Sequence, residues 1–421
     1  MKIAVIGTGI AGNVAARELC REHDVTVYEA AGHVGGHSHT HEVEVDGCRV
    51  SVDTGFIVFN RSTYPLFDAL LGKLGVPSQE SSMSFSVRCE ASGLEYNGTS
   101  LDGLFAQRRN LLRPSFLGMV ADILRFNREA PRLLEHPEGE KPLGELLDEG
   151  GYGRAFREQY LVPMGAAIWS TDPASMLNFP ARFFIRFLHN HGMLSVDARP
   201  VWRTVTGGSA RYVERLVAPF RDRIRLRTPV ASIQRISGGV LVTPRGAAPT
   251  RYDAVFLACH SDQALAMLAD PTPAERSVLG AIGYSVNEAV LHTDERLLPR
   301  SRRAWAAWNY HRLPQADHLV ALTYNMNILQ RLSTPRPLLV TLNRGDGIDP
   351  ARVLRRMTYH HPLFTPSAVA AQARHAELDR DRTFYCGAYW RYGFHEDGMW
   401  SALEAVRHFR ERHSRPRLQV A

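Results

Sequence analysis

Three glycines near the N-terminus have the types and spacing of a phosphate-binding turn. Gly7, Gly9 and Gly12 follow the wholly apolar run 3–6 and open a segment of helical periodicity that continues to Leu19. In such a turn the first glycine permits the tight bend, the second lets a pyrophosphate approach the backbone, and the third lets helix and strand pack closely. The N–H groups of a helix N-terminus also favour an anion. The predicted contacts are Gly7, Gly9, Ile10, Ala11 and Gly12.

An acidic residue follows at the distance that a ribose requires. The run 25–28 is typical of a second strand, and Glu29 follows it, 22 positions after Gly7. A carboxylate there accepts hydrogen bonds from ribose hydroxyls and repels a 2′-phosphate, which disfavours NADP. Strand, glycine turn, helix, strand and acid in this order predict a dinucleotide-binding βαβ unit.

A second glycine-rich loop favours FAD over NAD as that dinucleotide. Gly35 and Gly36 precede the histidine-rich segment 37–41 and two alternating apolar runs joined at Asp46-Gly47, which is a strong hairpin signal. This arrangement resembles the glycine-doublet loop of the flavin amine oxidase superfamily, which runs past the flavin. The residues that the resemblance assigns to FAD here are Gly35, Gly36, His37, Thr54, Gly55 and Phe56.

The C-terminal segment supplies the matching half of the site. A buried strand is predicted at 383–386, and a glycine- and aromatic-rich loop leads to a helix that we expect to start near Gly398. The N-terminus of this helix, aimed at the flavin pyrimidine, would stabilise negative charge on the reduced ring. Val230 resembles the superfamily position whose backbone contacts adenine. The predicted contacts of this part are Val230, Gly387, Gly398 and Met399.

Nearly the whole chain resembles a bacterial family of FAD-dependent oxidoreductases within that superfamily, similar to the flavoprotein domain fused ahead of plant cyclopropane fatty acid synthases. The segments that carry the resemblance are 52–60, 93–100, 258–263, 304–310, 323–327 and 386–390. It implies an α/β fold: a Rossmann-like FAD-binding domain with an inserted α+β substrate domain, in an amine oxidase or glutathione-reductase-like architecture. It also implies an association with the modification of acyl chains.

The two expected domains are interleaved along the 421 residues, which suffice for both. The FAD-binding domain is predicted to comprise 1–75, 197–290 and 376–421, and the substrate domain 76–196 and 291–375.

Composition excludes several classes of protein. The net charge of +7 is spread along the chain without a basic tract, so no nucleic-acid partner is expected. The five cysteines never form a CxxC pair, which argues against a disulfide framework or structural zinc. No apolar run is long enough to span a membrane. We therefore expect a cytoplasmic protein.

Two stretches, 108–128 and 176–188, combine apolar residues at helical spacing with arginines. Two interpretations stay open for them. They either pack as ordinary helices with solvated arginines, or they dock on anionic phospholipid, which would make the protein peripheral to the inner membrane.

One absence separates this chain from the amine-oxidising members of the superfamily. Those enzymes typically hold a lysine beside flavin N5, in the second half of the chain, and here no lysine follows Lys141. Arginine is a poor substitute, because its permanently charged guanidinium cannot shuttle a proton. Oxidation of a free amine is therefore the weaker interpretation.

Histidine and aromatic residues near the expected flavin are the candidates for catalysis. His395 is the preferred general base, and Tyr324 and Trp390 are predicted to form walls of an apolar substrate tunnel. The alternating histidines of segment 37–41 have the types of metal ligands. Their place beside the flavin favours hydrogen-bonding roles instead, so no metal is predicted.

The function predicted from these residues is an FAD-dependent oxidoreductase that acts on lipid acyl chains by hydride transfer to or from the flavin. Its expected partner is a lipid or another apolar small molecule. Two alternatives stay open. One is an amine oxidase or carotenoid-desaturase-like flavoenzyme, and the other is a non-catalytic flavin-binding partner of a lipid methyltransferase.

Overall fold

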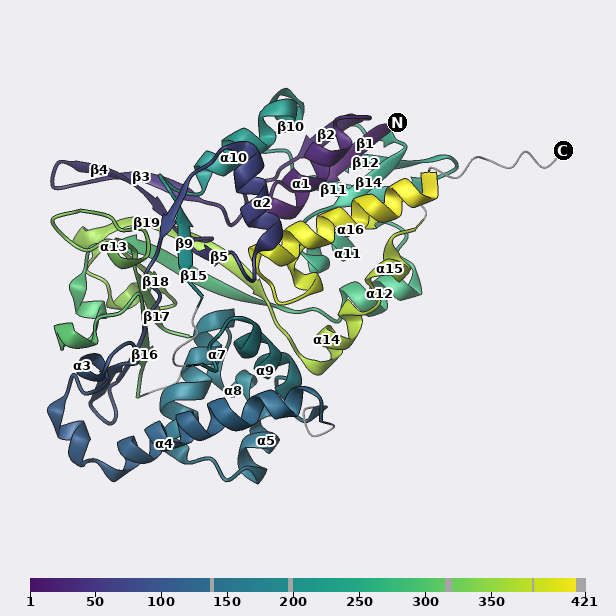
Figure 1. The fold of residues 1–421 in the computed structure, drawn as a ribbon. Coiled ribbons are helices and arrows are strands. Elements are labelled where there is room, and N and C mark those ends of the chain that lie inside the picture. The colour runs from purple at the N-terminus through teal and green to yellow at the C-terminus, as the bar shows by residue number, and fades with distance from the viewer. Residues whose placement is uncertain (137–139, 196–199, 315–319, 381, 414–421) are drawn as a thin grey trace.

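A five-stranded parallel sheet forms the centre of one half of the molecule (Figure 1). The computed structural model describes residues 1–136, 140–195, 200–314, 320–380 and 382–413. The sheet has the order β10-β2-β1-β14-β20, and all neighbouring strands are parallel. Its strands are β1 (Lys2–Ile6), β2 (Asp24–Tyr28), β10 (Ile224–Arg225), β14 (Ala254–Leu257) and β20 (Thr383–Tyr385). Segments from the beginning, middle and end of the chain therefore build one sheet, which confirms the expected α/β fold.

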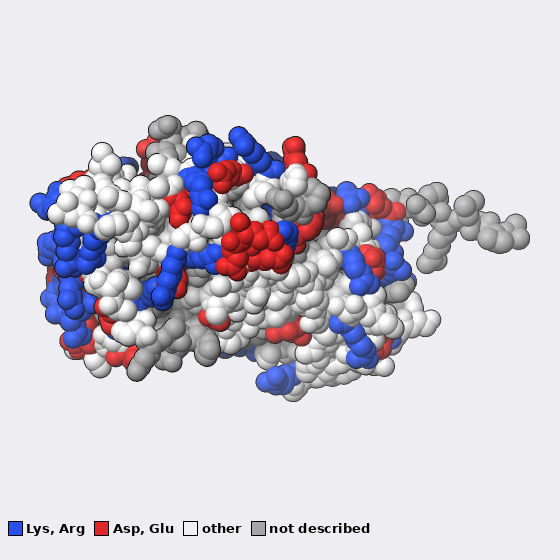
Figure 2. Space-filling model, turned by 90° about the horizontal axis from the view of Figure 1, so that it is seen from below, with Lys and Arg blue, Asp and Glu red and all other residues white. Residues whose placement is uncertain are grey.

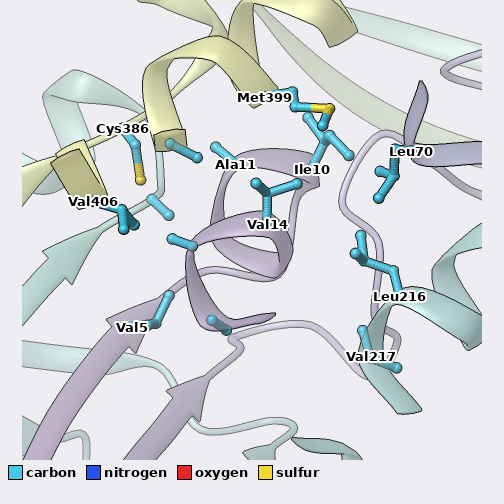
Figure 3. Close-up of a cluster of buried hydrophobic side chains, with 14 of the residues drawn as sticks. Val5, Ile10, Ala11, Val14, Leu70, Leu216, Val217, Cys386, Met399 and Val406 are labelled. Atoms are coloured by element: carbon cyan, nitrogen blue, oxygen red, sulfur yellow. The ribbon is translucent and has the colours of Figure 1, made fainter. Parts of the chain in front are cut away.

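Both faces of this sheet are covered, which is why its central strands are continuously apolar. Ile3 and Val5 belong to one core and Ala4 and Ile6 to another, so successive side chains of β1 enter opposite layers. The first core is built around α1 (Figure 3). It contains α1 (Ile10–Leu19), α2 (Pro65–Leu74), α10 (Ala210–Val217) and α16 (His395–His413). The other face carries β11 (Val230–Ile236), β12 (Gly239–Pro244) and β13 (Thr250–Tyr252), with α11 (Ser261–Met267) and α12 (Pro273–Leu279).

The last helix begins earlier than the sequence pattern predicts. It starts at His395 rather than near Gly398. The Asp397 carboxylate accepts a hydrogen bond from the Phe394 N–H at 2.9 Å, and the Asp397 N–H donates back to the Phe394 carbonyl at 3.0 Å. This side chain satisfies a donor at the start of the first turn, which extends the helix toward its N-terminus.

A seven-stranded mixed sheet forms the second half, with the order β19-β15-β18-β17-β16-β7-β8. Its strands are β7 (Phe85–Cys89), β8 (Leu94–Asn97), β15 (Tyr284–His292), β16 (Trp308–Arg312), β17 (Leu322–Asn325), β18 (Leu339–Leu342) and β19 (Val353–Pro362). Because β15 begins at Tyr284, this sheet takes in residues before the expected boundary at 290. The division into two domains otherwise stays a prediction.

A group of helices packs below this sheet in Figure 1. It comprises α3 (Leu101–Leu104), α4 (Pro114–Glu129), α5 (Leu143–Glu149), α6 (Arg154–Phe156), α7 (Val162–Trp169), α8 (Pro173–Met176) and α9 (Ala181–Asn190). Shorter helices elsewhere are α13 (Met326–Leu329), α14 (Pro366–Gln372) and α15 (His375–Leu378). In the described part of the chain, no helix combines the length and apolarity that crossing a bilayer requires.

Short strands connect the two halves. The predicted hairpin is confirmed as β3 (Thr40–Val45) and β4 (Cys48–Asp53), with Asp46 at φ 50° and Gly47 at φ 80° in its turn. Two successive left-handed residues are what a tight hairpin turn requires. A second small sheet has three strands in the order β5 (Phe59–Asn60), β9 (Trp202–Val205) and β6 (Ser78–Glu80).

Asp53, at the end of this hairpin, is a buried carboxylate surrounded by donors. It accepts hydrogen bonds from the Ser209 N–H at 2.9 Å, the Thr40 hydroxyl at 2.6 Å and the Gln330 side-chain amide at 3.1 Å. Burial raises its pKa to about 6. The carboxylate thus holds together three segments that are far apart in the sequence.

Replacing Asp53 by asparagine is expected to lower the free energy of unfolding by about 2 kcal/mol at pH 8. In asparagine an NH2 group replaces one carboxylate oxygen. Its N–H donors would then face the N–H and O–H donors that Asp53 accepts from. Urea unfolding followed by circular dichroism measures the change. The control is Asp46, in the turn of the same hairpin, which forms an exposed ion pair with Arg336. Asp46→Asn should lower the free energy of unfolding by less than about 1 kcal/mol.

Candidate active site

A cavity of about 1700 Å³ runs from the parallel sheet to α4 and the mixed sheet. A site for one small ligand typically measures roughly 300–1,000 Å³. The cavity therefore has room for a large cofactor and a second molecule beside it.

The glycine turn forms one end of the cavity. Gly7 adopts φ +103°, and a Cβ there would lie 2.5 Å from the Ala258 carbonyl oxygen. A Cβ on Gly9, by contrast, would meet no atom within 4 Å, and Gly9 lines the cavity at the start of α1. The open space lies in front of the N–H groups of a helix N-terminus, so it fits a pyrophosphate.

Glu29 lines the cavity beside this turn. Its carboxylate accepts hydrogen bonds from the Thr8 N–H at 2.9 Å and from the Ala31 N–H at 2.7 Å, which fix its orientation. Val230 lies on the wall of the same end. This pairing of a held carboxylate and a strand backbone fits the ribose and adenine of a dinucleotide.

The glycine-doublet loop lies against the glycine turn. A Cβ on Gly36 would be 3.0 Å from the Gly9 Cα, and a Cβ on Gly55 would be 2.2 Å from the His37 carbonyl oxygen. The Phe56 N–H donates to that same carbonyl at 2.7 Å. Contacts this close leave no room for side chains between the loops. The predicted residues of this group that line the cavity are Gly35, Gly36, His37, Thr54, Gly55 and Phe56.

Several buried polar atoms on the cavity wall have no partner within the described protein. They are His37 Nε2, His260 Nδ1, Trp308 Nε1 and the Tyr389 hydroxyl. Buried polar groups are almost always hydrogen-bonded, because leaving one unpaired costs about 1–3 kcal/mol. These atoms therefore fit a polar ligand such as FAD inside the cavity.

A cluster of imidazoles surrounds His37, and the sequence analysis missed most of it. The His37 ring centre lies 5.6 Å from that of His361 and 6.4 Å from that of His260. Burial lowers the pKa of His37 and of His260 to about 4 and that of His361 to about 3. All three rings are therefore neutral at pH 7. His260 lies in segment 258–263, which carries the family resemblance. No motif or resembling segment of the sequence includes His361.

The C-terminal contacts differ in part from those expected. Gly387 lines the cavity, but neither Gly398 nor Met399 is among the described residues of its wall. A Cβ on Gly398 would lie 2.8 Å from Ile10 Cγ2, and Met399 belongs to the core around α1 (Figure 3). These two residues pack α16 onto α1, so their prediction as direct cofactor contacts is not supported.

Two further residues near the C-terminus lie away from the cavity. Trp390 stacks on His375 with ring centres 4.1 Å apart and is absent from the described cavity wall, so its predicted role stays a prediction without support from this geometry. Cys386 is buried in the core around α1, and burial raises its thiol pKa well above the usual value (Figure 3). This location disfavours covalent attachment of a flavin through Cys386.

His395 and Tyr324 both line the cavity. His395 stacks on Phe56 at 3.7 Å, its Nε2 is 2.6 Å from the Tyr212 hydroxyl, and burial lowers its pKa to about 3. It is a neutral imidazole with one nitrogen engaged by protein. Tyr324 meets Trp308 edge to face, with ring centres 5.1 Å apart. The catalytic roles of both residues stay predictions.

The end of the cavity beyond the imidazoles is free of charged side chains. Among the described wall residues only Glu29 and Arg245 carry charge, and Arg245 bonds through its N–H to the Pro229 carbonyl, beside the adenine end. No lysine lines the cavity. In the described part of the chain no three His, Cys, Asp or Glu residues are grouped as a metal site.

Comparison with known proteins agrees with this geometry. The family model described as "Flavin containing amine oxidoreductase" matches residues 10–346, most of the chain. The chain belongs to this family. Membership indicates an oxidoreductase that uses FAD. The glycine turn and Glu29 stay the residues that we predict to hold it.

Three relatives of the chain have low sequence identity to it. The putative flavin-containing monoamine oxidase AofH of Mycobacterium tuberculosis is 28% identical over 57% of this chain and 53% of its own length, so the match spans about half of that relative. Cyclohexylamine oxidase from Brevibacterium oxydans has the same fold, with 15% identity, a TM-score of 0.71 and coverage of 98% and 99% of the two chains. A CLA-producing fatty acid isomerase from P. acnes does too, with 18% identity, a TM-score of 0.69 and coverage of 97% and 98%.

Proposed function

We propose that this family member is an FAD-dependent oxidoreductase that acts on lipid acyl chains. The observation that carries the proposal is the uncharged wall of the cavity beyond the nucleotide end. An acyl chain needs no charged partner, whereas a bound ammonium is stabilised by a carboxylate or by a cage of aromatic ring faces, because burying an unpaired charge is costly. The resemblance to flavoprotein domains fused to cyclopropane fatty acid synthases, and a neighbour of the same fold named as a fatty acid isomerase, support the same class of substrate.

Bound FAD would supply two-electron chemistry: oxidation of an acyl chain would move a hydride from carbon to the flavin and a proton to a base, with oxygen as the final acceptor, and the reverse reduction would draw its electrons from a partner reductase. The protein's own residues bind, orient and exclude water. Trp308 and Tyr324 offer two ring faces against which a chain can lie. The neutral imidazoles add polar atoms without a charge that would attract water.

Anaerobic mixing of the yellow protein with candidate substrates tests the proposal. We expect oleoyl or other unsaturated phosphatidylglycerol, dispersed in detergent, to bleach the visible flavin band, and cyclohexylamine or putrescine to leave it unchanged. Bleaching by the amines alone would establish amine oxidation instead. A flavin that no lipid or amine reduces would contradict the proposed oxidoreductase and favour a non-catalytic partner of a lipid methyltransferase.

A charge placed in the apolar end should stop lipid turnover while FAD stays bound. Phe85 lines that end at the start of β7. We expect Phe85→Glu to lower kcat/KM for the lipid at least 100-fold, because the carboxylate must be desolvated when the chain enters. Phe85→Leu, the matched apolar control, should lose less than tenfold. The ratio of FAD to protein, read from the absorption spectrum, should be unchanged in both.

A further inference from the structure

Exposed leucines are concentrated in one short part of the chain. Among the described residues nine large hydrophobic side chains are exposed, and five of them lie between positions 101 and 124. Leu112 is 87% exposed and Leu101 77%. The full group is Leu101, Leu111, Leu112, Leu117 and Leu124, and we call it the leucine patch. The five leucines lie on three consecutive elements, α3, residues 108–112 and α4, and this many exposed leucines in one part of the chain favour an interaction surface.

The helix α4 is apolar on its outer side as well as on its inner side. Phe116, Met119 and Phe126 face the core. Leu117 and Leu124 are exposed on the opposite side, seven positions apart, which is two helical turns. A surface helix normally presents polar residues to water, so packing within the protein does not account for the outer leucines.

Positive charge surrounds the leucine patch. Residues 101–134 contain six arginines and three acidic residues. Each acid already has an arginine beside it: Asp102 with Arg108, Asp122 with Arg125, and Glu129 with Arg128. No described carboxylate lies within ion-pair distance of Arg113 or Arg132, so the region has an excess of cations.

Figure 2 views the molecule from the side on which α4 lies in Figure 1. It shows a broad surface without charged side chains and a gathering of basic side chains at its left end, the side of α3. Acidic side chains gather near the centre instead. On this face the largest gathering of basic side chains thus lies at the end where α3 and the beginning of α4 are found.

The cavity opens beside the leucine patch. Leu124 is 56% exposed and also lines the cavity. Val120 and Ile123, on the same helix, line the cavity too, as does Leu104 of α3. The outer surface of α4 and the wall of the cavity are therefore joined through Leu124.

We propose that the leucine patch and its arginines dock this protein on the surface of a bilayer that contains anionic phospholipid. The leucines would reach the acyl boundary and the arginines would contact headgroup phosphates. The proposal deepens the proposed function, on which it rests for the identity of the molecule that enters the cavity. An apolar surface ringed by cations matches a negatively charged membrane in both apolarity and charge.

Sedimentation with vesicles tests the docking. The FAD-loaded protein should bind vesicles of phosphatidylglycerol and phosphatidylcholine, and should bind pure phosphatidylcholine at least tenfold more weakly. Leu112→Glu combined with Leu117→Glu should lower the affinity at least tenfold, and Arg113→Glu with Arg132→Glu about as much, since each cation near the surface contributes roughly fivefold. The matched controls Leu226→Glu and Arg276→Glu, exposed elsewhere, should bind as the parent does.

Equal vesicle binding by the patch variants and the controls would overturn the docking proposal, as would binding that ignores lipid charge. The same conclusion follows if the purified protein forms a dimer through this patch that the leucine substitutions dissociate. Flavin bleaching by detergent-dispersed lipid should be unchanged in Leu112→Glu/Leu117→Glu, because neither residue lines the cavity. Vesicle binding without any lipid-dependent bleaching would leave the docking intact and contradict the proposed function alone.

Discussion

The Gly9→Val variant is expected to fold normally and to bind FAD at least 1,000-fold more weakly, a loss of roughly 4 kcal/mol. The valine side chain would extend into open cavity, where no protein atom lies within 4 Å of the Cβ position. The backbone of Gly9, at φ −63° and ψ 179°, is open to any residue. The added atoms would occupy the space in front of the α1 N-terminus, where we expect the pyrophosphate.

Two glycine variants make this result specific to the cofactor. Gly72→Val places the same side chain in equally open space on α2, away from the cavity, and should keep its FAD. Gly12→Val should fail to fold, because its Cβ would lie 2.0 Å from the Gly7 carbonyl oxygen. Absorbance gives the FAD content, and circular dichroism of the FAD-free protein gives its stability. A yellow Gly9→Val protein would show that the dinucleotide lies elsewhere.

The FAD-free protein is expected to unfold on mild acidification, between about pH 6.5 and pH 5. Burial lowers the pKa of six histidines far below the value of about 6.5 of an unfolded chain. The pKa is about 4 for His37, His191, His260 and His292, and about 3 for His361 and His395. The folded protein thus excludes protons that the unfolded chain takes up.

The direction of the effect follows from proton linkage. Above pH 7 these histidines are neutral in both states and do not change the free energy of unfolding. As the pH falls below 6.5, only the unfolded chain is protonated, so the folded state loses stability. At pH 5 each such histidine costs roughly 2 kcal/mol. Asp53 and Asp397, whose pKa burial raises to about 6 and about 7, offset part of this cost because they take up protons in the folded state. The remaining loss is still a large part of the stability of a typical domain, about 5–15 kcal/mol.

Urea midpoints measured from pH 8 to pH 5 check this prediction. His361→Gln should reduce the slope of the free energy of unfolding against pH by the equivalent of nearly one bound proton. His189→Gln, at an exposed position, should leave this slope unchanged. Bound FAD should delay the acid transition, since it binds the folded state and not the unfolded chain. A midpoint that stays constant between pH 7 and pH 5 would contradict the buried, neutral state of the imidazoles.

Local motifs were predictable because their chemistry is contained in a few consecutive residues. Gly7, Gly9, Gly12 and Glu29 need only a strand, a turn and a helix around them, and β1, α1 and β2 supply these elements. The hairpin at Asp46-Gly47 is predictable for the same reason, since its turn requires left-handed backbone at both positions. The comparison with known families confirms the FAD-using oxidoreductase that these motifs indicated.

Sequence patterns were less informative where a side chain's direction depends on distant packing. Trp390 and Met399 have types and positions suited to a cavity wall, but the cores around His375 and α1 hold them. His361 carried no signal, because its place beside His37 depends on the register of β19 against β15. The sequence also left open whether stretch 108–128 belongs to the core or to the surface. Only the exposed fraction of each leucine in the folded protein decides this.

By itself the sequence determined the dinucleotide fold, the FAD-binding turn and the absence of a lysine after position 141, because each depends only on residue types and on short spacings between them. Tertiary structure alone decided three things: the convergence of imidazoles from a turn, a loop and strand β19, the exclusion of charge from the far end of the cavity, and the place of exposed Leu124 on the wall of that cavity. Each depends on which faces meet after folding, and periodicity along one segment does not specify that.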